Sequence, residues 1–247
     1  MKKFMRYALL SAVLSLTVTS YTVYHPQSVD IPLINHAGDV RIDASMGTSV
    51  FILPDAINLN VTGSYGINDW LAGQVHLNYG VDNYYGQIAP GVYFPLGQNS
   101  VFECYAGMGY GGSNRDDISA DYSERTTSSN NYSFSGHYML PFAQGNIGWH
   151  DLTDVHFDIA LGMKVGAFMP DFHYYEVDNG GNEIAGSSQD YTTTNLLLEP
   201  QLMLRMGSQS LKFNVKFGIA WMNDLSESSN KFIYDIVTAS AGLTFSF

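Results

Sequence analysis

The 247-residue sequence has few charged residues, a single cysteine and no long apolar run beyond its first twenty residues. Cys104 alone excludes an internal disulfide, and the missing run excludes a membrane-spanning helix in the exported part of the chain. Acidic residues outnumber basic ones by 23 to 11. This negative charge disfavours contact with phosphate backbones, so we expect no nucleic-acid partner.

The beginning of the sequence has the features of an export signal. Basic residues at positions 2, 3 and 6 precede the apolar run 7–18, which is too short to cross a bilayer as a helix. We therefore expect residues 1–20 to be a signal peptide. Residues 21–38 contain two prolines and show no periodicity, so we expect an extended periplasmic lead-in there.

Apolar and polar residues alternate through the rest of the chain in short segments. In one of these, Leu59 and Val61 alternate with Asn60 and Thr62. A period of two predicts strands with one apolar and one polar face. Ten such segments follow one another, so we predict that residues 39–247 form an all-β fold, a ten-stranded antiparallel up-and-down transmembrane β-barrel.

The connections between these segments alternate in length. Short connections are predicted at residues 67–70, 95–100, 150–154 and 207–210, and longer ones at 49–56, 80–84, 111–131, 169–191 and 223–231. Tight turns at one end and long loops at the other are typical of barrels in the bacterial outer membrane.

The chain ends in Leu243-Thr244-Phe245-Ser246-Phe247. This segment resembles the closing strand of small bacterial outer-membrane β-barrel proteins, whose assembly machinery recognises alternating apolar residues that end in phenylalanine. The resemblance is to the general class and matches no specific family within it. It implies an outer-membrane location, contact with outer-membrane lipid, and recognition of the C-terminal strand by the barrel assembly machinery.

Charged residues on the strands are predicted to face the lumen, because a cation on the lipid face near the midplane costs about 2–4 kcal/mol. They are Arg41, Asp43, Glu103, Asp158, Lys164, Glu199, Arg205, Lys212 and Lys216. These five cations and four anions nearly balance, which favours an ion-pair network that fills a narrow lumen over a selectivity filter.

Aromatic residues near the strand ends are predicted to form girdles at the two membrane surfaces. The girdle residues are Trp70, Tyr79, Trp149, Trp221, Phe245 and Phe247. In one segment the alternation shifts by one residue. Tyr138 and Phe142 stand at even-numbered positions, whereas Ile147 and Trp149 stand at odd-numbered ones. An extra residue in a strand would produce this change, so we predict a β-bulge within residues 141–145.

Residues that could carry chemistry are few. His137, with Ser133 and Ser135, resembles the serine and histidine sets of outer-membrane lipid A-modifying enzymes, but the sequence shows no group to orient the histidine. We expect no metal and no cofactor. The sequence therefore predicts a non-enzymatic barrel with a filled or very narrow lumen and acidic external loops that contact ligands or surfaces. A small-solute pore and a lipid A-modifying enzyme stay open as alternatives, and the oligomeric state is not predicted.

Overall fold

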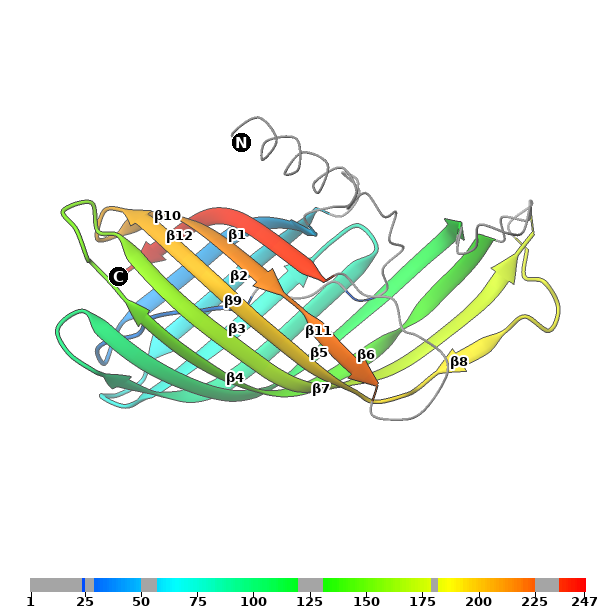
Figure 1. Ribbon diagram of the computed structural model, residues 1–247, viewed down its shortest axis with the longest axis horizontal. Coiled ribbons are helices and arrows are strands. Elements are labelled where there is room, and N and C mark those ends of the chain that lie inside the picture. Colours follow the sequence, from blue (N-terminus) through cyan, green and yellow to red (C-terminus); the bar gives the residue numbers. More distant parts are fainter. Residues whose placement is uncertain (1–23, 25–28, 50–56, 120–130, 179–181, 225–235) are drawn as a thin grey trace, which may run out of the picture.

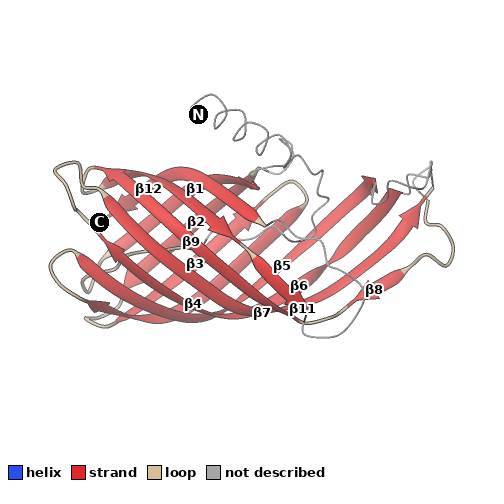
Figure 2. Cartoon of the chain, in the orientation of Figure 1, coloured by secondary structure: helices blue, strands red, loops and turns tan. Residues whose placement is uncertain are grey.

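The computed structural model describes residues 24, 29–49, 57–119, 131–178, 182–224 and 236–247. The predicted signal peptide, residues 1–20, lies outside these ranges. The described strands are β1 (Val40–Ser49), β2 (Asn58–Gly66), β3 (Leu71–Tyr79), β4 (Asn83–Pro95), β5 (Ser100–Ser119), β6 (Asn131–Trp149), β7 (Asp158–Val177), β8 (Gln189–Tyr191), β9 (Asn195–Gly207), β10 (Leu211–Ile219), β11 (Trp221–Asp224) and β12 (Val237–Ser246). Figure 2 shows that the regular elements in these ranges are strands. None of the described residues forms a helix with the length and apolarity needed to cross a bilayer.

These strands form a closed barrel (Figure 1). Strands β8 and β9 follow each other along β7, and β10 and β11 follow each other along β9, so the twelve segments make ten wall strands. Neighbours are antiparallel, and β12 pairs with β1 from Arg41 opposite Ser246 to Ser49 opposite Thr238. The predicted all-β, ten-stranded up-and-down barrel is confirmed.

The two ends of the barrel differ. At one end, the turn end, the connections are short: residues 67–70, 96–99, 150–157 and 208–210. The third of these is longer than the predicted 150–154, because Asp151 and His156 adopt a left-handed backbone conformation that cannot continue a strand (φ 53° and 46°).

At the other end, the extended end, β5, β6 and β7 project beyond the other wall strands, and the short β8 pairs with the projecting part of β7 (Figure 1). The sequence predicted loops over 111–131 and 169–191, and this is wrong for much of both ranges, since β5 continues to Ser119 and β7 to Val177. Pairing continues there because the inner face still carries aromatic side chains that bury one another, among them Phe134 and Phe172.

The polarity of the wall is the reverse of that in a water-soluble protein. Leu59, Leu77 and Phe213 point outward and are exposed, whereas Asn60 and His76 point inward and are buried. A soluble protein rarely exposes so continuous an apolar surface. An exterior of this kind is stable in the hydrocarbon of a membrane, where closure of the barrel also pairs the edges of the first and last wall strands.

The predicted bulge in β6 is wrong. Residues 141–145 pair with β5 in unbroken register, and the pairs with β7 on either side of them have the same register. Tyr138 and Phe142 face the lumen and are buried, whereas Trp149 faces outward. Even- and odd-numbered residues lie on the two faces of one regular strand. The alternation is lost here because apolar residues occupy the lumen face as well.

The lipid-facing exterior can be tested at the middle of β3. Val75→Arg, on the outward face, should lower the free energy of unfolding by about 2–4 kcal/mol, measured by urea unfolding from phospholipid vesicles. Val81→Arg, just beyond the outer end of the same strand, is the control and should cost about 0–1 kcal/mol. Equal costs for the two variants would contradict a membrane-embedded exterior.

Candidate functional site: the lumen

The structure places the nine charged residues predicted from sequence on the lumen side of the wall. Arg41 is half-buried at the turn end of β1. The other eight residues are at most 3% exposed: Asp43, Glu103, Asp158, Lys164, Glu199, Arg205, Lys212 and Lys216. Charges this deeply buried need partners, because an isolated ion in a low-dielectric interior is strongly destabilising.

Asp43 is the centre of the largest group of lumen charges. Its carboxylate accepts hydrogen bonds from Lys216 Nζ at 2.9 Å, Thr244 Oγ1 at 2.9 Å and Asn214 Nδ2 at 3.0 Å. The guanidinium of Arg205 lies 3.8 Å away. Strands β1, β9, β10 and β12 each contribute one or more of these residues, so the group joins the wall across its closing seam.

A second pair of lumen charges lies toward the extended end. Lys164 Nζ is 3.6 Å from a Glu199 oxygen, donates to Gln87 Oε1 at 3.0 Å, and sits 5.0 Å from the centre of the Phe142 ring. The ammonium therefore has an ionic, a polar and an aromatic partner, which together replace its lost hydration.

A third group of charges lies at the turn end, and it includes Asp151, which the sequence did not predict. Lys212 donates to Asp158 at 2.6 Å and to Asp151 at 2.9 Å. His150 and His156 also contact the Asp151 carboxylate. Burial raises the pKa of Asp151, but the hydrogen bonds from Lys212 and the two histidines outweigh it and lower that pKa to about 2. Asp151 therefore stays ionised and holds the β6–β7 turn against the wall.

The chain's own residues 29–34, which we call the lumen segment, lie inside the barrel. In Figure 1 they form the dark blue trace that runs along it toward β1. Arg205 donates to the carbonyl oxygens of Ile31 at 2.7 Å and Pro32 at 3.2 Å, and Glu103 accepts the Ile34 N–H at 2.8 Å. These bonds satisfy backbone groups that have no strand partner. The expected extended lead-in thus includes a stretch enclosed by the barrel.

The side chains of the lumen segment fit a space that small wall residues leave. Val29, Ile31, Leu33 and Ile34 are buried in one cluster with wall residues Ala72, Ala89, Tyr93, Val101, Tyr105, Phe142, Ala160 and Met203. A Cβ on Gly148 would lie 2.6 Å from Leu33 Cδ2, and one on Gly162 would lie 3.0 Å from Ile31 Cδ1. Glycine at these two positions therefore allows the segment to approach the wall.

The lumen segment also adds a charge that sequence analysis missed. Asp30 lies 3.6 Å from Lys216 Nζ and accepts a hydrogen bond from Ser64 at 3.3 Å. With Asp30 added to the four wall anions, the five wall cations face five anions. The alternation of Val29, Asp30 and Ile31 is too short, and too close to Pro32, to predict a strand or a position inside the barrel.

Aromatic side chains fill the lumen toward the extended end. Tyr24 is fully buried, donates to Glu199 at 2.9 Å, and packs edge-on against Tyr138 and Phe168 with ring centroids 5.5 and 4.9 Å apart. The same cluster contains Tyr85, Phe134, Leu140, Phe172, Tyr191, Leu197 and Ala220. Charged layers and apolar layers therefore follow one another along the barrel axis.

The six predicted girdle residues lie on the outward surface. These residues are 36–75% exposed: Trp70, Tyr79, Trp149, Trp221, Phe245 and Phe247. Trp70, Trp149, Phe245 and Phe247 lie near the turn end, whereas Tyr79 and Trp221 lie farther along their wall strands. Phe247 continues the closing seam, since its N–H donates to the Val40 carbonyl at 3.0 Å.

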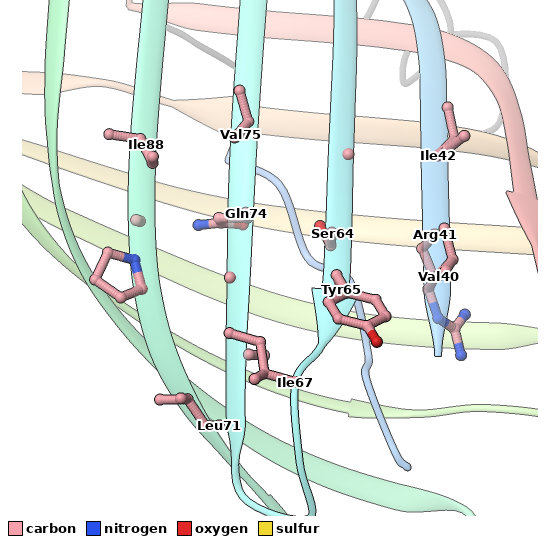
Figure 3. Close-up of a pocket in the computed structure, with 15 residues that line it drawn as sticks. Val40, Arg41, Ile42, Ser64, Tyr65, Ile67, Leu71, Gln74, Val75 and Ile88 are labelled. Atoms are coloured by element: carbon pink, nitrogen blue, oxygen red, sulfur yellow. The ribbon is translucent and has the colours of Figure 1, made fainter. Parts of the chain in front are cut away.

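The exterior has a shallow hollow of about 740 Å³ across β1 to β4. The labelled side chains of Ile42, Tyr65, Val75 and Ile88 surround it (Figure 3). Gly63 and Gly73 form part of its floor, with open space where a side chain would stand. The hollow faces the lipid side of the wall and has almost no polar surface.

The structure does not bring together the serine and histidine residues proposed from sequence. His137 faces outward, with its Nε2 3.6 Å from Asp171 Oδ2, whereas Ser133 lies four residues, or about 13 Å, away along β6 and is buried. Among the described residues, no group of three or more histidine, cysteine or acidic side chains could hold a metal ion.

No protein-family model and no curated protein matches this sequence. Among solved structures, the chain is similar to OmpT, an outer membrane protein of Vibrio cholerae, at 8% identity over 88% of this chain and 100% of that one, with a TM-score of 0.20. It is also similar to a bacterial polysaccharide outer membrane secretin, at 10% identity over 87% and 99%, with a TM-score of 0.22. Similarities this weak carry no argument. The closed ten-stranded wall, the polar lumen and the apolar, aromatic-flanked exterior define a bacterial outer-membrane β-barrel protein.

The charge network predicts a large effect of a nearly isosteric change at its centre. Asp43→Asn would leave Lys216 and Arg205 buried with less compensation, so it should lower the free energy of unfolding by about 3–5 kcal/mol. Thr244→Val removes one hydrogen bond to the same carboxylate and one from Asn214, and should cost about 1–3 kcal/mol. Urea unfolding from vesicles measures both. A loss at Asp43→Asn no greater than the loss at Thr244→Val would show that the network does not depend on this charge.

Proposed function

We propose that this protein is a sealed outer-membrane barrel that does not conduct solutes and acts through its outer end. The observation that carries the proposal is the lumen segment, whose backbone is hydrogen-bonded to Arg205 and Glu103 inside the wall. A pore needs a continuous path for water and solute. The segment occupies the turn-end half of that path, and the aromatic cluster around Tyr24 occupies the other half.

The arrangement of charge supports sealing over selective conduction. A selectivity filter exposes charges to the permeating ion. Here the eight deeply buried lumen charges are at most 3% exposed, and Lys216, Lys212 and Lys164 each face a carboxylate. In our proposal these charges are structural, and the lumen carries out no chemistry.

The extended end is the part of the molecule suited to interaction. Tight turns of outer-membrane barrels face the periplasm, so β5, β6 and β7 project from the cell surface. Asp171 and Asp190 are 67% and 74% exposed there. These exposed acidic groups support a role in contact with external ligands or surfaces. The apolar hollow over Gly63 and Gly73 supports contact with an acyl chain of membrane lipid.

Planar-bilayer conductance tests the proposal. The native protein should show no steady large openings. Replacing residues 29–34 with a Gly-Ser linker of equal length should produce steady openings, because the apolar and polar contacts of the lumen segment are removed. The same replacement at 182–186, an exposed part of the extended end, is the control and should leave the barrel closed.

Retained heat-dependent mobility in SDS electrophoresis would show that each variant still forms a barrel. Steady large openings of the native protein would overturn the sealed-barrel proposal. A closed linker variant would show that the wall side chains, and not the lumen segment, seal the barrel.

A further inference from the structure

A serine, a histidine and an aspartate are joined by hydrogen bonds at the extended end. His173 Nδ1 lies 2.8 Å from Asp190 Oδ1, and His173 Nε2 lies 3.1 Å from Ser188 Oγ. An aspartate accepts, so the proton between the first two residues belongs to Nδ1, and Nε2 is left to accept the serine hydroxyl. This is the order of contacts that activates serine in Ser-His-Asp hydrolases.

Strand pairing fixes the histidine and the aspartate relative to each other. His173 on β7 and Asp190 on β8 are directly opposite in the sheet. The neighbouring pair, Phe172 opposite Tyr191, is buried on the inner face. The apolar contacts of that inner pair anchor β8 against β7, so the polar pair on the outer face has a rigid support.

A hydrogen-bonded turn fixes the serine. Ser188 immediately precedes β8 and lies two residues after Gly186, whose φ of +85° allows the tight reversal. Ser187 stabilises the same turn, because its hydroxyl accepts the Glu176 N–H at 2.9 Å and donates to the Ile184 carbonyl at 2.8 Å. Sequence reasoning favoured His137 because it is adjacent to serines along one strand. The hairpin that brings Ser188 to His173 was predicted as a loop.

The position of the set relative to the membrane indicates the kind of substrate. On the outward face of β6 and β7, the exposed pair Met139 and Met169 is followed outward by His137 opposite Asp171, and then by His173. Each step of two residues is about 7 Å, so the wall changes from apolar to polar within about 13 Å. This is the depth at which acyl chains give way to headgroups. The side chains of His173 and Asp190 are 46% and 74% exposed, which leaves the set open to a ligand.

We propose that Ser188, His173 and Asp190 form an acyl-ester hydrolase site that acts on O-acyl esters of lipids in the outer leaflet. Ser188 Oγ attacks the ester carbonyl carbon while its proton passes to His173 Nε2, and a tetrahedral oxyanion forms. Collapse breaks the bond to the alcohol oxygen, which leaves with the proton from His173. Water then attacks the acyl-serine, gives a proton to His173 and releases the fatty acid, and the serine recovers its proton. Asp190 orients the imidazole and stabilises its charged form throughout.

A fluorophosphonate probe tests the serine directly. Ser188 Oγ should displace fluoride from phosphorus, and peptide mass mapping should locate the adduct on Ser188. His173→Gln should slow labelling by about 10²–10⁴-fold, because the general base is lost. Asp190→Asn should slow it less, since water can partly replace so exposed a carboxylate.

His137→Gln is the matched control, an outward histidine paired with an aspartate but not with Ser188, and its labelling rate should equal that of the native protein. Heat-dependent mobility in SDS electrophoresis shows that each variant is folded. Absence of an adduct on Ser188 in the folded native protein would overturn the site, as would equal labelling rates for His173→Gln and the native protein.

Two esters test whether the substrate is a membrane lipid. p-Nitrophenyl palmitate in mixed micelles should be hydrolysed, and Ser188→Ala should abolish the reaction. p-Nitrophenyl acetate in solution should react far more slowly. Labelling of Ser188 together with hydrolysis of the soluble ester alone would overturn the lipid substrate. These outcomes are independent of conductance, so a failure of this site and a failure of the sealed-barrel proposal are distinguishable.

Discussion

The guanidinium of Arg205 is the contact on which the interior depends. It donates to two carbonyl oxygens of the lumen segment and also lies 3.8 Å from Asp43 on β1. Burying the four apolar side chains of the segment gains about 1.5–3 kcal/mol each. Ordering the backbone of its six residues costs about 1–2 kcal/mol per residue, so these two contributions nearly cancel. Hydrogen bonds to a charged group contribute about 1.5–3 kcal/mol each and therefore decide whether the segment stays in place.

The dependence is mutual. Without the segment, Arg205 would lose two of its acceptors and Lys216 would lose Asp30, which leaves buried cations with fewer partners. Without the wall charges, the segment would have unsatisfied backbone groups in an apolar cavity. Barrel and segment are therefore parts of one cooperative structure, and the polar layer around Asp43 and Arg205 couples them.

Much of the wall could be predicted from sequence because lipid and lumen impose opposite demands on alternate residues. The alternation of Lys212, Asn214 and Lys216 with apolar neighbours predicts their inward orientation, and all three are buried. Prediction from the alternation of apolar and polar residues fails where both faces of a strand are apolar, as at Tyr138 and Phe142 on β6. It also misses contacts between residues far apart in the chain. Arg205 contacts Ile31 across 174 positions, and a short stretch of alternation gives no sign that its partner is the inside of a barrel.

Disulfide trapping tests the central claim, that residues 29–34 lie inside the wall, most directly. The Cγ1 atom of Ile31, where a cysteine sulfur would stand, lies 3.1 Å from the position of a Cβ on residue 162. In a Cys104→Ser background, Ile31→Cys with Gly162→Cys should therefore form a disulfide in vesicle-embedded protein, identified as a linked peptide by non-reducing mass mapping. Ile31→Cys with Gly73→Cys, whose second position faces lipid and open space, should form none. Equal linkage in both pairs, or no linkage in the first, would contradict a lumen segment held inside the barrel.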